Sequence, residues 1–297
     1  MLTKFTVTAT ALLALAALCG CGGAAETAAP SPGSTAEGKE VQMEAAKADC
    51  MKQKGFKYVA YVTPHKPGTE DDKSRMRGNY QAMRKYREKY GFGVFAQHVY
   101  PKEMGAAPTS PDNEPNPNMK IQNALSKTQM QAYRKAMDAC QVSAANKVLG
   151  LKLKSTEDFY DAQFKASARA RKGKLNTDTE LVELATAMAT CLKGKGYAVT
   201  DTTPVTMSEL GQKTWLGKED KLGREQMDDV PDVAPPAEDD KVPMYYAPTL
   251  APEQAKPYLA KEIRAALDDL ECGKDFYPAY LPKEQAVQGQ VSAQFGM

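Results

Sequence analysis

This 297-residue chain has few of the features that would assign it to a common functional class. Aromatic residues make up only 8% of it, and two histidines are present. Beyond the N-terminal segment, no apolar run approaches the roughly 20 residues that a membrane-spanning helix needs, which excludes a transmembrane bundle. The formal net charge of +2 excludes a general role in binding nucleic acids or other polyanions.

The motifs that mark common catalytic sites are also absent. The sequence has no Gly-x-Ser-x-Gly, no His-Glu-x-x-His, no phosphate-binding glycine loop and no Ser-x-x-Lys with its partner motifs. Two acidic pairs, Asp112 with Glu114 and Asp228 with Asp229, lie in proline-rich stretches. We interpret them as solvated loop charge rather than as the carboxylate pair of a glycosidase. The sequence therefore predicts no catalytic residue.

Metal and cofactor sites are not predicted either. No Cys-x-x-Cys is present for redox chemistry or for zinc. His65 and His98 are far apart in the sequence, with no cluster to join, and are expected at the surface. Among the aromatic residues, Trp215 is the one expected to act as a surface contact.

The N-terminus has the features of an export signal. Lys4 precedes an uncharged, mostly apolar segment over residues 5–18, and Leu18-Cys19-Gly20-Cys21 follows. This resembles the bacterial lipobox, which implies that residues 1–20 are removed and that Cys21 carries a lipid. The alternative is an ordinary secretory signal that is cleaved at the small residues just after Cys21.

Residues 21–39 predict a lipidated, disordered tether. They are small, polar or Pro/Gly residues, which cannot bury enough surface to offset the entropy of ordering. Such a chain has a reach of about 25 Å, at roughly 5–6 Å × √n. We expect it to hold the folded part close to the extracytoplasmic face of the cell membrane.

The most informative feature is a motif that occurs twice. Cys50-Met51-Lys52-Gln53-Lys54-Gly55-Phe56 returns as Cys191-Leu192-Lys193-Gly194-Lys195-Gly196-Tyr197. Each copy is predicted to end an amphipathic helix. Gly55 in the first copy and Gly196 in the second are expected in the left-handed conformation, and each is followed by an aromatic residue. A second match joins Leu125-x3-Gln129-x3-Tyr133 to Leu250-x3-Gln254-x3-Tyr258. These repeats predict two related units.

Four cysteines remain besides Cys21, namely Cys50, Cys140, Cys191 and Cys272. An even number in an exported chain predicts disulfide bonds, and cysteine counting leaves three connectivities open. The duplication favours Cys50–Cys140 and Cys191–Cys272, if each unit is a closed module. Each bond would close a loop of about 80–90 residues and stabilise the fold by about 4–5 kcal/mol on the chain-entropy model.

Hydrophobic periodicity predicts a mainly α fold with a few short β-strands. The predicted helices cover 41–54, 71–90, 126–149, 155–172, 177–191 and 252–271, and the predicted strands cover 56–62 and 92–100. The expected N-caps are Ser126, Ser155 and, for the helix at 177–191, Asn176 or Thr177. Two proline-rich loops are predicted at 101–120 and 227–243. The resulting organisation is a signal peptide (1–20), the tether (21–39), unit one (40–150), a connecting helix (151–176), unit two (177–281) and a flexible tail (282–297).

The chain resembles a loosely defined group of uncharacterised secreted lipoproteins of actinobacteria. The resemblance is carried by Cys50-Met51-x3-Gly55-Phe56, Tyr90-Gly91-Phe92-Gly93-Val94, Asn116-Pro117-Asn118, and Leu125-Ser126 leading to Tyr133 and Cys140. It covers most of the chain after the signal, with unit two as a partial second copy that lacks the Tyr-Gly-Phe-Gly stretch. It implies a lipid-anchored, disulfide-stapled exported module and no particular activity.

These features predict a non-enzymatic binding or accessory protein of the cell envelope. Its expected partners are the membrane, through the Cys21 lipid, and an envelope protein or wall polymer, with no nucleic acid. The expected contact surfaces are residues 90–120 and 205–248, because loops on a rigid scaffold usually carry function. The alternatives are an enzyme acting on the cell wall and a regulator of a membrane sensor.

Overall fold

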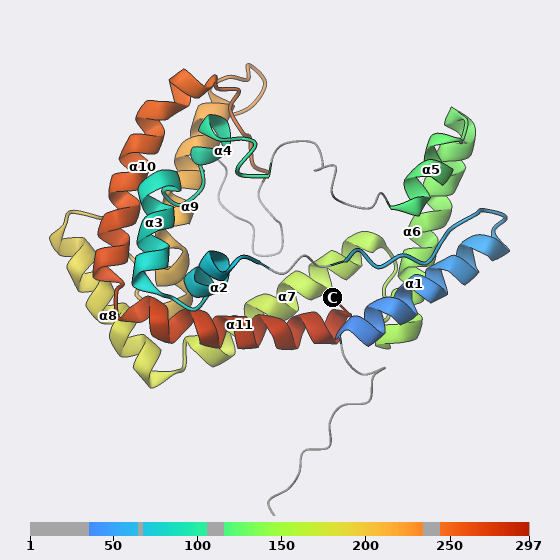
Figure 1. The fold of residues 1–297 in the computed structure, drawn as a ribbon, viewed down its shortest axis with the longest axis horizontal. Coiled ribbons are helices and arrows are strands. Elements are labelled where there is room, and N and C mark those ends of the chain that lie inside the picture. The colour runs from blue at the N-terminus through green and yellow to red at the C-terminus, as the bar shows by residue number, and fades with distance from the viewer. Residues whose placement is uncertain (1–35, 65–67, 106–115, 234–243, 297) are drawn as a thin grey trace, which may run out of the picture.

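The computed structural model describes residues 36–64, 68–105, 116–233 and 244–296. In this part the chain forms eleven helices and no β-strand, so the mainly helical class is confirmed (Figure 1). The helices are α1 (Ala36–Gln53), α2 (Glu70–Met76), α3 (Tyr80–Tyr90), α4 (Ala96–Val99), α5 (Pro117–Asn123), α6 (Lys127–Leu149), α7 (Thr156–Leu175), α8 (Thr179–Gly194), α9 (Pro204–Arg224), α10 (Pro252–Cys272) and α11 (Phe276–Phe295). None of these described helices is long and apolar enough to cross a bilayer.

The helices form two groups joined by a pair of long helices (Figure 1). One group contains α1, α5 and α6, and the other contains α3, α4, α8, α9 and α10. Between them α7 and α11 pack side by side. Helix α7 also contacts α6 and α9, and α11 also contacts α1 and α8, so the pair connects the two groups.

Helix α11 corrects the expectation of a flexible tail at 282–297. Its last turns bury Val287, Val291 and Phe295, which are 2–6% exposed. These residues are spaced by four, so they lie on one helix face. Phe295 meets Phe159 of α7 edge to face, and Val291 shares their core with Met43 of α1. Burial of this stripe therefore holds residues 282–295 in place.

Neither predicted strand forms in the described residues. Residues 56–64 are irregular, and 92–100 contain a tight turn followed by α4. In both places a side chain makes backbone hydrogen bonds that a neighbouring strand would otherwise make. The Asn118 amide bonds both backbone groups of Val59, at 2.8 Å each. The Glu262 carboxylate accepts from the backbone N–H groups of Phe92 and Val94. With these groups satisfied, no strand partner is required.

The helix predicted over 71–90 is split in two by Gly78. This residue has a φ of 78°, which favours glycine, and a Cβ there would lie 2.5 Å from the carbonyl oxygen of Tyr277. The Asn79 side chain then accepts from the N–H of Ala82 and caps α3. The break lets α3 pack along α10.

Several predicted boundaries also shift. Helix α1 begins at Ala36, inside the predicted tether, and α7 continues through Gly173 to Leu175. The N-cap of α8 is Asp178 rather than Asn176 or Thr177. The capping residues predicted for α6 and α7, Ser126 and Ser155, are confirmed as halves of capping boxes.

The two predicted units do not pack as separate bodies. Helices α3 and α4 belong to the 40–150 stretch, yet they pack against α10 of the 177–281 stretch. Helix α11, which extends into the predicted tail, packs against α1. The tertiary contacts therefore cross the boundaries that the sequence repeat predicts.

Candidate functional site

The two copies of the repeated motif end their helices in the same way. Gly55 and Gly196 have φ values of 82° and 87°. The following aromatic residue donates its N–H to the carbonyl five residues back, from Phe56 to Met51 at 2.9 Å and from Tyr197 to Leu192 at 3.0 Å. This is the hydrogen-bond pattern of a glycine-terminated helix, as the motif predicts.

Each helix end is then bonded to a second helix. The disulfides are Cys50–Cys140 and Cys191–Cys272, with Cα–Cα distances of 5.6 and 5.5 Å. The intra-unit pairing favoured by the repeat is confirmed. Both bonds fix the start of the segment that follows the motif glycine.

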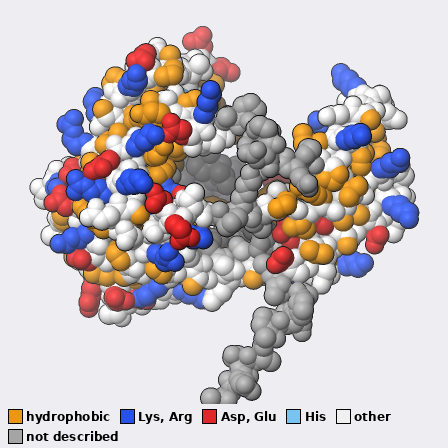
Figure 2. Space-filling view, viewed as in Figure 1, with side chains coloured by type: hydrophobic (Ala, Val, Ile, Leu, Met, Phe, Trp, Pro, Cys, Tyr) orange, Lys and Arg blue, Asp and Glu red, His pale blue; other side chains and the backbone are white. Residues whose placement is uncertain are grey.

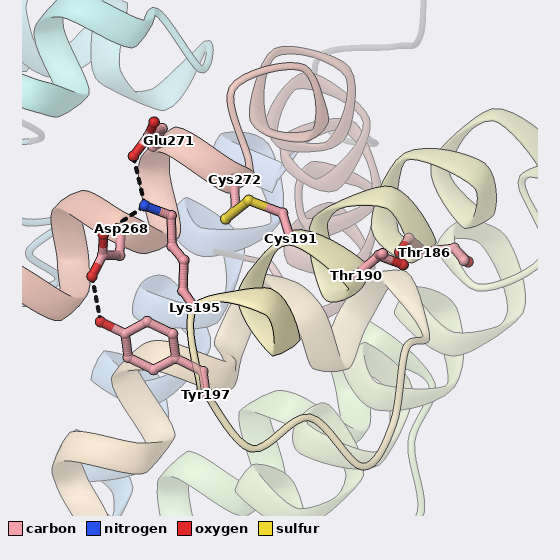
Figure 3. The surroundings of a disulfide bond; sticks show 8 residues. All are labelled: Thr186, Thr190, Cys191, Lys195, Tyr197, Asp268, Glu271 and Cys272. Carbon is pink, nitrogen blue, oxygen red and sulfur yellow. Dashed lines mark hydrogen bonds and ion pairs between the residues drawn. A yellow bond between two sulfur atoms is a disulfide. The ribbon is translucent and has the colours of Figure 1, made fainter.

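Ion pairs and a hydrogen bond join the same two helix ends beside the Cys191–Cys272 disulfide (Figure 3). The Lys195 ammonium lies 2.9 Å from Asp268 and 2.8 Å from Glu271, and the Tyr197 hydroxyl donates to Asp268 at 2.6 Å. The Tyr197 bond, and after it the Lys195 charge, lower the pKa of Asp268. Burial, followed by the Asp268 bond, raises the pKa of Tyr197 to about 12. The Tyr197 ring is thereby fixed against α10.

We call the cluster of Lys195, Tyr197, Asp268 and Glu271 the copy-two clamp. Beside it lies a cavity of about 320 Å³, which we call the basic pocket. Its walls come from the end of α8, from α9 and from α10. The lining residues are Phe92, Leu192, Tyr197, Ala198, Leu210, Gly211, Thr214, Trp215, Lys218, Lys261, Arg264, Ala265 and Asp269. This volume is at the lower end of the range for small-ligand sites.

Gly211 sets the width of the pocket. A Cβ on this residue would lie 2.1 Å from the Phe92 ring, so only glycine lets α9 approach that closely. Trp215, one turn further along α9, is 5% exposed and meets Phe95 edge to face. Trp215 is therefore a wall of the pocket, and the expectation of a surface contact is wrong.

Three cationic side chains stand at the pocket: Lys218, Lys261 and Arg264. Within the described part of the chain, none of them forms an ion pair. The Lys218 ammonium lies 3.7 Å from the centre of the Trp215 ring. Burial, and after it the charge of Lys261, lower the pKa of Lys218. Two like charges close enough to affect each other favour an anion between them.

The acid at the base of the pocket is already neutralised. Asp269 is 3% exposed, lies 2.5 Å from the Arg87 guanidinium and accepts from the Tyr277 hydroxyl at 2.6 Å. Burial raises the pKa of Tyr277 above its ordinary range, so Tyr277 remains a neutral donor. Asp269 therefore has its own partners, and the nearby carboxylate that responds to a pocket cation is Asp268, whose pKa the Arg264 charge helps to lower.

A buried carboxylate on α10 positions the Phe92 wall. Glu262 is fully buried and accepts from the N–H groups of Phe92, Val94 and Phe95 at 2.8–2.9 Å. Burial raises the pKa of Glu262, and the three N–H groups oppose that rise. The Tyr-Gly-Phe-Gly stretch of unit one is thereby bound to a helix of unit two.

A second polar cluster joins α4, α9 and the segment before α10. His98 Nε2 lies 2.5 Å from Glu219 Oε1, and the Tyr245 hydroxyl donates to the other Glu219 oxygen. Glu219 is 4% exposed, so His98 is a paired residue and not the isolated surface histidine expected from the sequence. Within the described residues no group of three His, Cys, Asp or Glu is arranged to hold a metal ion.

The predicted contact surfaces are only partly where they were expected. Residues 93–96 are buried, and 204–224 form α9, whose inner face is core. Asp228 and Asp229 are exposed, as expected of loop charge. Cys21, the predicted lipidation residue, lies outside the described residues, as do His65, Asp112 and Glu114.

No protein-family model, no curated protein and no solved structure matches this chain. The sequence signals for the pocket were the second motif copy and the lysines of α9 and α10. Sequence reasoning missed Lys218 because α9 was not predicted as a helix. It missed Lys261 and Arg264, although their helix was predicted, because the residues of α9 that face them lie far away in the sequence. Their meeting point depends on how α9 crosses α10.

Proposed function

We propose that this chain is a non-enzymatic binding protein of the cell envelope, held at the extracytoplasmic face of the membrane by a lipid on Cys21. Its binding site is the basic pocket, and the ligand is a small anion that also carries a flat apolar ring. An envelope protein or wall polymer that carries such a group would be the partner. The lipobox-like sequence and the paired cysteines support export, and the pocket supports the ligand class.

The observation that carries this proposal is the set of three cations without ion-pair partners beside aromatic walls. An anion at the mouth would lie near Lys218, Lys261 and Arg264. A flat apolar body would contact Trp215, Phe92 and Tyr197. Stacking against aromatic faces and pairing with partly desolvated cations each favour binding. The buried Asp269 is paired already and repels little.

Fluorescence provides a direct test, because Trp215 is the only tryptophan of the chain. The probe is anilinonaphthalene sulfonate, an aromatic anion that accepts energy from tryptophan. Its matched control is N-phenylnaphthylamine, which has the same rings without the sulfonate. With the full chain carrying Cys21→Ser, so that no lipid is attached, we expect the anion to bind about tenfold more tightly, equivalent to about 1.4 kcal/mol.

The pocket cations are tested with paired variants. Lys218→Gln combined with Lys261→Gln should remove the advantage of the anionic probe over the neutral one. The control is Lys213→Gln, on the same helix, whose ammonium is exposed and paired with Glu209. Equal binding of the two probes to the unchanged pocket, or no effect of the paired variants, would refute the proposed site.

The second candidate function is an enzyme acting on wall polymer, and the His98–Glu219–Tyr245 cluster carries it. A histidine held by a buried carboxylate has the arrangement of a general base with its orienting group. Turnover of purified wall polymer by the full chain, lost in His98→Ala and retained in Lys213→Gln, would establish this function in place of the first.

A further inference from the structure

Beside the first motif copy lies an open groove of about 630 Å³, which we call the copy-one groove. It runs between the segment after α1 and the helices α5 and α6. The lining residues are Gly55, Phe56, Lys57, Val59, Pro117, Lys120, Ile121, Ala124, Leu125, Gln129 and Tyr133. Figure 2 shows hydrophobic side chains gathered on this group of helices, with Lys and Arg side chains around them.

The groove and the basic pocket occupy the same register relative to the disulfides. The aromatic residue six positions after the first cysteine lines each hollow, as Phe56 and as Tyr197. Eleven residues before the second cysteine lie Gln129 and Lys261, and both line their hollows. Measured from the disulfides, the two hollows therefore lie at the same place, although the sequence repeat itself aligns Gln129 with Gln254.

Seven residues before the second cysteine, the two hollows differ. Copy one has Tyr133 at this register and copy two has Ala265. Phe56 meets Tyr133 edge to face at 5.5 Å, so in copy one the aromatic pair forms the floor of an open groove. In copy two the smaller alanine stands at this register, and residues of α9 line the hollow.

The Tyr133 hydroxyl indicates that the groove is a binding site. Tyr133 is 2% exposed, and its hydroxyl has no hydrogen-bond partner of normal geometry in the described residues. Burial raises its pKa, and the Gln122 side chain opposes that rise without satisfying the hydroxyl. A buried hydroxyl without a partner costs free energy that a ligand atom would recover.

The charges at the groove indicate the sign of the ligand. Lys57 and Lys120 are exposed, and neither forms an ion pair in the part of the chain that the structure describes. No acidic residue is among the lining residues. Most of the remaining lining is apolar and includes Val59, Ile121 and Leu125. This composition fits an anionic head group attached to a flexible alkyl chain.

We propose that the copy-one groove is a second ligand site, which binds a single-chain amphipathic carboxylate such as a fatty acid. The head group lies between Lys57 and Lys120, and the alkyl chain lies over Phe56, Ile121 and Leu125. The Tyr133 hydroxyl donates to the ligand. This proposal rests on the proposed function, because it makes the envelope protein a carrier with two sites of the same charge preference.

The test is a calorimetric titration of the full chain carrying Cys21→Ser with laurate below its micelle concentration. Dodecyltrimethylammonium, with the same chain and the opposite charge, is the ligand control. We expect Lys57→Gln combined with Lys120→Gln to remove one equivalent of bound laurate. The variant control is Lys127→Gln, an exposed lysine of α6 outside the groove lining.

Trp215 separates the two sites in the same samples. It lines the basic pocket and not the groove, so the groove variants should leave its response to anilinonaphthalene sulfonate unchanged. Unchanged laurate stoichiometry in the groove variants, or equal binding of the cationic surfactant, would overturn the second site. A loss of the Trp215 response that occurs only in the pocket variants bears on the proposed function. It does not change the conclusion drawn from the groove variants.

Tyr133→Phe provides a further readout. Because the hydroxyl has no partner among the described residues, its removal should not lower the melting temperature. It should weaken laurate binding by about threefold to tenfold, the value of one hydrogen bond of about 0.7–1.4 kcal/mol. A lower melting temperature with unchanged laurate affinity would mean that Tyr133 is structural only and would remove it from the site.

Discussion

The ends of α1 and α8 carry the same motif, the same helix termination and an equivalent disulfide bond, but their surroundings differ. After the first copy the chain runs as an open segment held by Asn118, and the hollow beside it stays a groove. After the second copy, α9 crosses the equivalent position and lines a smaller hollow. The duplicated helix ends and disulfides therefore form the scaffold. The segment that follows each motif copy determines the shape and charge of the hollow.

Copy two also holds a segment from the other half of the chain. Glu262 binds the backbone of residues 92–95, which places Phe92 against Gly211. The described lining of the copy-one groove comes from 55–59 and 117–133 alone. The basic pocket therefore depends on contacts between both halves, whereas the copy-one groove depends on one. The following predictions test this difference.

The largest effect is expected from the disulfides. Replacing Cys50 and Cys140 with serine, or Cys191 and Cys272, should lower the free energy of unfolding by about 4–5 kcal/mol in each case, because the closed loops have similar lengths. Urea denaturation measures this. Only the second pair should also reduce the Trp215 response to the anionic probe. If removal of Cys50–Cys140 reduces that response equally, the two hollows are not independent.

A smaller effect is expected from Glu262→Ala. The change leaves three backbone N–H groups without an acceptor in a buried site, and we expect a loss of about 3 kcal/mol in the free energy of unfolding. Hydrogen exchange at Phe92, Val94 and Phe95 should increase most. Glu253→Ala is the control, because that side chain is exposed and paired only with Lys256 on the same helix. Exchange that rises uniformly along the chain would argue against a local role.

Two glycines of α9 make a matched pair. Gly211→Ala forces a Cβ into the Phe92 ring and should cost about 1–3 kcal/mol while displacing Phe92 in the basic pocket. Gly217→Ala meets nothing within 4 Å and should stabilise the helix by about 0.5–1 kcal/mol. Thermal unfolding and probe affinity measure both changes. Destabilisation by Gly217→Ala would show that the helix geometry is not as described.

The smallest effect concerns Asp268, the carboxylate of the copy-two clamp. Its pKa is lowered in the folded state, so it contributes stability above its ordinary value of 3.8 that is lost as pH falls through the lower folded pKa. Asp268→Asn should therefore lower the melting temperature slightly at neutral pH, by about one degree. The difference should shrink below that ordinary value. A difference that stays constant with pH would mean that the carboxylate charge is not involved.

The sequence predicted those parts of the fold that depend on neighbouring residues. The capping residues Ser126 and Ser155, the helix-ending Gly55 and Gly196, and the helices after each cap were found because capping and left-handed turns act within a few residues. The stripe of Val287, Val291 and Phe295 was also available as a four-residue spacing, but 282–297 was predicted as a flexible tail. Packing against α7 and α1 orders this segment.

The candidate site was less predictable. Trp215 was noticed, but its burial follows from contacts with Phe95, which lies 120 positions earlier in the chain. His98 looked isolated because its partner Glu219 is 121 positions away. The strand-like composition of 56–62 was real, yet the strand did not form because Asn118 supplies the hydrogen bonds of Val59.

The sequence by itself determined the two helix ends, because each copy of the motif contains the glycine that ends its helix. It also favoured the two disulfide pairs, because each copy contains one cysteine. Only the tertiary structure decided which segments line each hollow and which charges surround it. The reason is distance along the chain. Phe92 and Glu262 are 170 positions apart, and such contacts leave no periodic pattern in the sequence at either end.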